Sequence, residues 1–282
     1  MLDIFLLPFM QRAFLIGAIA AVPFGVIGAF IVVRRIGYLA GAIAHCAFGG
    51  IGIGLYLQYL LAASTVAVLF DPMFVSVVVA VFSALVIGVV RRKAKEREDT
   101  VIGAIWAVGM ALGLLLLEQT PGNVGISNYL FGNILLITQR DVWIVGALSL
   151  FVLTVVGLFF KRLEAVCFDE EFARLRGVST TWYFQLLLVL TALTVVLLVR
   201  VVGIVLVIAM LTLPAATAGR LTKRLLPMCL LSILLCAVFS WIGLLIVCVF
   251  GNLPAGPTIV LVAAVVYLIS LLNLIRNIFR NK

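Results

Sequence analysis

The sequence has very few charged residues. Only 11% of its 282 residues are Asp, Glu, Lys or Arg, whereas 65% are hydrophobic, and the mean hydropathy is +1.34. A soluble domain carries about a quarter charged residues and at most about half apolar ones. This scarcity of charge excludes an ordinary soluble protein and predicts an all-α polytopic membrane protein.

Catalytic motifs are also missing. The sequence contains no HExxH, GxSxG or Walker GxxxxGK[ST] pattern, it has a single histidine, and its five cysteines form no CxxC pair. We therefore expect no enzyme and no tightly bound cofactor. If the chain worked in a transporter driven by ATP, another chain would have to hydrolyse the ATP. The net charge of +9 does not indicate nucleic-acid binding, because the basic residues cluster between apolar runs and form no basic face.

Long apolar runs are abundant. Nine are close to the length of about 20 residues that crosses the hydrocarbon core as a helix. The expected spans are 13–33, 37–59, 65–90, 101–117, 142–160, 182–199, 203–218, 226–250 and 258–275. The third is expected to start near Pro72, where Asp71-Pro72 interrupts its run. Segment 128–138 is too short to cross the membrane and predicts a re-entrant helix. We therefore expect eight or nine spans, all within one transmembrane domain over residues 1–282.

Most basic residues fall on one side of this path. Loops that alternate along the spans collect 17 of the 20 Lys and Arg residues on one side, whereas only Arg12, Arg140 and Arg200 fall on the other. Cytoplasmic loops are enriched in Lys and Arg. We therefore expect the loop at about 161–180 and the C-terminus to lie in the cytoplasm.

One polar segment has an amphipathic helical pattern. In 161–178, KRLEAVCFDEEFARLRGV, the residues Phe168, Phe172 and Leu175 recur at spacings of three and four, with charged residues between them. A short helix with one apolar edge, placed between two spans, is suited to packing against a partner.

His45 is the only histidine of the chain, and it lies in the middle of the second predicted span. Gly37, Gly41, His45 and Gly49 are four residues apart and therefore share one face of the helix, where glycines let another backbone approach closely. Imidazole is a common transition-metal ligand, and an ionisable group inside a membrane is a functional candidate. A neutral histidine bonded across two helices is the alternative interpretation.

Pro214 lies inside the seventh predicted span. Proline removes one helical hydrogen bond, so it predicts a kink that frees the carbonyl of Met210, a feature of gating helices and of ordinary membrane helices alike. The acidic residues Asp71, Glu118 and Asp141 lie near span ends, where a solvated helix end is the default interpretation.

Several stretches in order resemble the permease subunits of the ABC importers for zinc, manganese and iron. They are RRIGYLAGAIAHCAFGGIGIG, YLFGNIL followed by Asp141, FDEEFARLRGV, GIVLVIAMLTLPAATAGRL and LPAGPTIVL, and they cover nearly the full chain. The resemblance implies a permease fold of the vitamin-and-metal importer type in a bacterial inner membrane. It also implies a second permease, two ATPase subunits and an extracytoplasmic metal-binding protein as partners.

The resemblance assigns roles to particular residues. His45 matches a metal-site histidine, and the helix around Phe168–Gly177 matches the element that couples the permease to its ATPase. In that element Phe168, Phe172 and Leu175 would make the buried contact and Gly177 would end the helix. The polar rim of the contact would be formed by Asp169, Glu171, Arg174 and Arg176. Ala173 also belongs to the matching stretch.

Two positions depart from the family pattern. The family carries an aspartate four residues before the histidine and often another before YLFG, whereas this chain has Gly41 and Gly125 there. Three explanations stay open: a different permease in the pair supplies the ligands, the substrate differs, or the ligands lie elsewhere. The alternatives to metal-ion import are ABC import of a metal chelate such as a siderophore or corrinoid, a stand-alone secondary transporter or channel, and an intramembrane enzyme.

Overall fold

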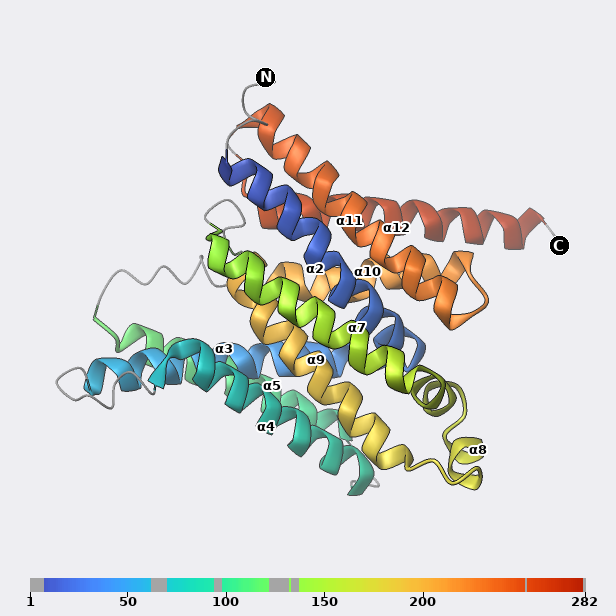
Figure 1. Ribbon diagram of the computed structural model, residues 1–282, viewed down its shortest axis with the longest axis horizontal. Helices are drawn as coiled ribbons and strands as arrows, with labels where there is room; N and C mark the ends of the chain where they lie inside the picture. The colour runs from blue at the N-terminus through green and yellow to red at the C-terminus, as the bar shows by residue number, and fades with distance from the viewer. Residues whose placement is uncertain are drawn as a thin grey trace. The chain divides into compact units, whose positions relative to one another are not determined.

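The computed structural model describes residues 8–61, 70–93, 98–121, 132, 137–251 and 253–280. All regular elements within these residues are α-helices (Figure 1). Their bounds are α2 Pro8–Val33, α3 Gly37–Leu60, α4 Pro72–Lys93, α5 Glu98–Glu118, α7 Gln139–Phe168, α8 Glu170–Leu175, α9 Thr180–Val202, α10 Ile204–Leu221, α11 Leu225–Phe250 and α12 Ala255–Arg280.

Nine helices of the described residues are long and apolar enough to cross a membrane, which agrees with the higher of the two expected span counts. α4 begins at Pro72 as predicted. α7 differs, because it is 30 residues long and continues through the basic stretch to Phe168, whereas hydropathy predicted its end near Phe160. The predicted re-entrant helix at 128–138 lies almost entirely outside the described residues.

The described chain divides into two compact units. The first contains α2, most of α7, and α10 to α12, and the second contains α3 to α5, the end of α7, α8 and α9. In the first unit α11 lies along α2, and in the second α3 packs against both α4 and α5 (Figure 1).

The glycines of α3 bring its backbone against α5. A Cβ added at Gly49 would lie 2.6 Å from the carbonyl oxygen of Gly109, and one added at Gly109 would lie 2.9 Å from the Cα of Cys46. Lipid tails are as apolar as the helix surfaces, so close van der Waals contact and interhelical hydrogen bonds, rather than the hydrophobic effect, hold such helices together. The predicted glycine face of α3 is therefore the face that meets another backbone.

Two prolines inside helices leave carbonyl groups that side chains then satisfy. Pro214 cannot donate to the carbonyl of Met210, and the thiol of Cys236 on α11 donates to that oxygen at 3.6 Å. On α2, Pro23 leaves the carbonyl of Ile19, which accepts a hydrogen bond from the hydroxyl of Ser149 at 3.0 Å. In a membrane an unsatisfied carbonyl is costly, so these bonds link each proline helix to a neighbour within the first unit.

Candidate functional site

The short helix α8 has its own N-terminal cap. The carboxylate of Asp169 accepts a hydrogen bond from the backbone N–H of Phe172 at 2.9 Å. Glu170 and Glu171 follow in the first turn, where negative charge is stabilised by the helix dipole. Asp169, expected on a polar rim, therefore also starts the helix.

Gly177 ends α8 in a Schellman motif. The N–H of Val178 donates to the carbonyl of Ala173, and the N–H of Gly177 donates to the carbonyl of Arg174, both at 3.0 Å. Gly177 has a φ of +78°, which a residue with a Cβ adopts only with strain. The helix predicted around Phe168–Gly177 is thus present at Glu170–Leu175, while Phe168 is the last residue of α7.

The apolar residues of this segment are exposed. Phe168, Phe172 and Leu175 are 61%, 51% and 86% exposed, whereas Ala173 on the opposite side of α8 is buried. The guanidinium of Arg176 lies 5.0 Å from the centroid of the Phe172 ring. We call the surface of Phe168, Phe172 and Leu175 the α8 surface. Large apolar side chains exposed together on a short helix and at the end of the helix before it are typical of a protein contact.

His45 lies between α3 and α5 in the second unit. Its Nδ1 is 3.0 Å from the thioether sulfur of Met110, and its ring stacks on the indole of Trp106 with centroids 4.8 Å apart and an interplanar angle of 26°. The imidazole is partly exposed. Trp106 and Met110 are four residues apart on one face of α5, so one helix supplies both contacts.

Trp106 fills the place next to Gly41. A Cβ built at Gly41 would lie 2.9 Å from Cη2 and 3.1 Å from Cζ3 of the indole, closer than ordinary contact. The structure therefore brings an aromatic ring to the position from which a carboxylate would reach the imidazole. The other departure, Gly125, lies outside the described residues.

Two of the three acidic residues near span ends cap helices. Asp71 accepts the N–H of Met73 at 2.8 Å at the start of α4. Asp141 accepts the N–H and the hydroxyl of Thr138 at 3.0 and 2.6 Å at the start of α7, and Thr138 accepts the N–H of Asp141 in return. Glu118 is the exposed last residue of α5. Within the described residues, no three His, Cys, Asp or Glu side chains come together as metal ligands.

Sequence reasoning missed Trp106 and Met110. Both lie inside a correctly predicted span. The apolar composition of that span, however, does not predict how the helix is rotated about its axis. The spacing of four residues between them was the only available signal, and it does not say which neighbour they face.

The whole chain is similar to one family of transport proteins. Residues 6–273 match the model of the ABC 3 transport family. The chain belongs to this family. A "Probable metal transport system membrane protein" of Chlamydia pneumoniae is 42% identical to it over 270 residues, which cover 95% of this chain and 90% of the relative. The "Manganese transport system membrane protein MntC" of Listeria monocytogenes is 32% identical over 266 residues, 94% of this chain and 90% of the relative.

A solved structure agrees in fold over the same length. "PsaBC from Streptococcus pneumoniae in complex with Fab" aligns with a TM-score of 0.82 and 31% identity, covering 96% of this chain and 95% of the matched chain. The sequence matches show the ABC 3 transport family, and the match to this structure confirms the predicted all-helical permease fold.

Proposed function

We propose that this chain is the membrane permease of an ATP-driven importer that carries a divalent metal ion into the cytoplasm. Membership of the ABC 3 transport family and the transport names of its relatives support this function. The two units together form one permease domain over residues 1–282, in a bacterial inner membrane, with the loop at 161–180 and the C-terminus in the cytoplasm. The charge bias of the loops supports that orientation.

The single structural observation that supports coupling to an ATPase is the exposed α8 surface. It stands at the end of α7 that the charge bias assigns to the cytoplasm, where a soluble ATPase subunit is accessible. In the proposed complex Phe168, Phe172 and Leu175 pack into a groove of the ATPase. Glu171, Arg174 and Arg176 form the polar rim of that contact. ATP binds to and is hydrolysed on the separate ATPase subunit, and the resulting motion is transmitted through α8 to α7 and α9.

The importer also contains a second permease, identical or different, and an extracytoplasmic protein that delivers the ion. The metal ion is the cargo, and we propose that His45 meets it on its path through the membrane. The imidazole and the thioether of Met110 are both neutral ligands, and both are softer than carboxylate. Pro214 lies in α10, and the carbonyl of Met210 that it frees accepts a hydrogen bond from the thiol of Cys236 on α11. This arrangement suits a helix that moves during transport.

The experiment compares Phe172→Asp with Glu171→Gln in the complete transporter. A charge in place of the half-exposed ring removes apolar contact and leaves a desolvated carboxylate, so we expect loss of ATPase retention and of metal uptake, with membrane insertion unchanged. Glu171→Gln removes a charge of the polar rim and should lower both ATPase retention and metal uptake by less than about threefold. Retained ATPase binding and uptake in Phe172→Asp would contradict the proposed role of α8.

A further inference from the structure

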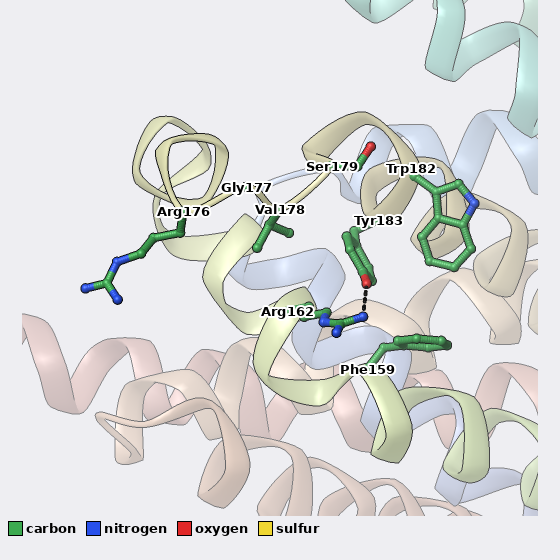
Figure 2. Close-up of a pocket in the computed structure, with 8 residues that line it drawn as sticks. All are labelled: Phe159, Arg162, Arg176, Gly177, Val178, Ser179, Trp182 and Tyr183. Carbon is green, nitrogen blue, oxygen red and sulfur yellow. Dashed lines mark hydrogen bonds between the residues drawn. The ribbon is translucent and has the colours of Figure 1, made fainter.

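A cavity of about 600 Å³ lies beside α8, where the end of α7, the loop after α8 and the first turn of α9 meet (Figure 2). All of its described walls belong to the second unit. None of its lining residues within the described part of the chain is acidic. The proposed metal path does not use this cavity, and of the coupling segment Phe168–Gly177 only Arg176 and Gly177 line it.

Arg162 supplies the positive charge of the cavity. Its Nη1 donates a hydrogen bond at 2.8 Å to the hydroxyl of Tyr183, a residue that is only 7% exposed (Figure 2). This bond holds the guanidinium against the cavity wall and leaves its other N–H groups able to donate. Arg176 also lines the cavity, but its guanidinium lies over the ring of Phe172 and points away from the other labelled side chains (Figure 2).

The remaining wall is aromatic. Phe159 contacts the edges of Trp182 and Tyr183 at centroid distances of 5.7 and 5.8 Å, and Trp182 and Tyr183 are 4.9 Å apart. Trp182 remains 49% exposed. Phe159 lies one residue before the end of an apolar run, and Arg162 follows Lys161 at the start of a basic one, so the cavity lies at the boundary between hydrocarbon and water. Trp and Tyr are enriched at this depth, beside lipid headgroups.

We propose that this cavity binds the headgroup of an anionic phospholipid. The guanidinium of Arg162 takes the phosphate, and the aromatic wall takes the glycerol backbone and the upper acyl chain. Ser179, whose side chain makes no capping hydrogen bond to α9, also lines the cavity. A free phosphate ion gains nothing from the aromatic side and meets a single cation, whereas a lipid is already concentrated at this depth.

A lipid at this position would contact three parts of the coupling region at once. It would touch the end of α7, the loop that follows the Schellman turn of α8, and the first turn of α9. The bound lipid therefore stabilises the direction in which α8 leaves the membrane surface. The proposal concerns lipid and depends on the cytoplasmic orientation, but not on which ion is transported.

The experiment titrates the purified full-length chain with phosphatidylglycerol, with phosphatidylcholine and with inorganic phosphate, and counts bound molecules by native mass spectrometry. We expect phosphatidylglycerol to bind about tenfold more tightly than phosphatidylcholine, and Arg162→Gln to remove most of that preference. Lys161→Gln is the matched control, because Lys161 is an exposed neighbouring cation that does not line the cavity. Tyr183→Phe should weaken binding by less than Arg162→Gln, since it removes only the group that positions the guanidinium.

Three results would overturn the proposal. Equal losses in Arg162→Gln and Lys161→Gln would mean that lipid senses only diffuse charge. Displacement of the lipid by millimolar inorganic phosphate would assign the site to the free ion. A third result is a normal lipid preference in Arg162→Gln combined with loss of the ATPase subunit from the complete transporter, which would assign the cavity to a protein partner. Arg162 is exposed, so its variant should fold, and the melting temperature of each variant checks this.

Discussion

Gly41→Asp would restore the carboxylate that the family carries. The structure predicts that this substitution destabilises the otherwise wild-type chain. The new Cβ lies 2.9 Å from Cη2 of Trp106, and ordinary contact begins at 3.4 Å, so the indole must move by about 0.5 Å before the carboxylate itself is placed. Overpacking of this kind costs about 1–3 kcal/mol. A carboxylate against an indole face is also poorly solvated, which adds to the cost.

The double variant Gly41→Asp/Trp106→Ala tests this reasoning. Trp106→Ala alone is destabilising because it leaves a cavity and removes the stack on His45. With the indole gone, the overpacking cost of Gly41→Asp disappears, so the two substitutions are coupled by about 1–3 kcal/mol. The free energy of unfolding, measured on the purified chain in detergent, gives the coupling energy directly.

Uptake of Mn²⁺ and Zn²⁺ by the complete transporter gives the functional half of the test. A carboxylate and an imidazole at i and i+4 share a face and chelate one ion. Mn²⁺ uptake should therefore rise in the double variant relative to Trp106→Ala, and His45→Ala should abolish the gain. In the otherwise wild-type chain His45→Ala should slow uptake without lowering assembly. If Gly41→Asp alone is as stable as the wild type, the indole does not fill this space and the reasoning is wrong.

Two further predictions concern helix ends and proline carbonyls. Gly177→Ala places a Cβ at a φ of +78° with no atom within 4 Å, so backbone strain alone should destabilise the end of α8 by about 1–2 kcal/mol and lower ATPase retention. Gly177→Asn should have a smaller effect. Equal effects of the two substitutions would count against the left-handed conformation of Gly177. Cys236→Ala removes the donor to the carbonyl of Met210 and should lower the free energy of unfolding by about 1 kcal/mol, measured by thermal unfolding. In a Pro214→Ala background the alanine N–H bonds that carbonyl, so the cost of Cys236→Ala should be about 0.6 kcal/mol smaller. An identical cost in both backgrounds would contradict the role assigned to the thiol.

Local patterns predicted much of the fold. Apolar length gave the nine spans of the described residues, and the three- and four-residue spacing gave α8 and its exposed apolar residues. The continuation of α7 to Phe168 was not predictable from hydropathy, because Lys161 and Arg162 mark the end of the apolar run and carry no signal that the helix stops. The capping pair of Thr138 and Asp141 does have a sequence signature, a hydroxyl residue followed three positions later by an acid.

Tertiary partners were not predictable in the same way. The bonds from Ser149 and Cys236 to proline-freed carbonyls join residues far apart in the chain, and nothing local distinguishes these donors from other small side chains in spans. The pairing of His45 with Met110 depends on how α3 and α5 are rotated, which an apolar helix does not encode in its hydropathy. Such contacts follow from packing of glycine faces, and only the existence of the α3 face was visible in the sequence.

The environment of His45 has an electrostatic consequence for transport. Imidazole and thioether are both neutral, so they do not compensate the charge of a divalent ion, and a carboxylate at Gly41 would overpack against Trp106. Asp71 and Asp141, at span ends, are bonded to helix N-termini. Two copies of this chain would double the neutral ligands, and within the described residues no group of three His, Cys, Asp or Glu side chains comes together to hold an ion. A second, different permease that carries a carboxylate beside its histidine would add an opposing charge. The complex purified through a tag on this chain therefore distinguishes the two pairings by whether it contains one permease sequence or two.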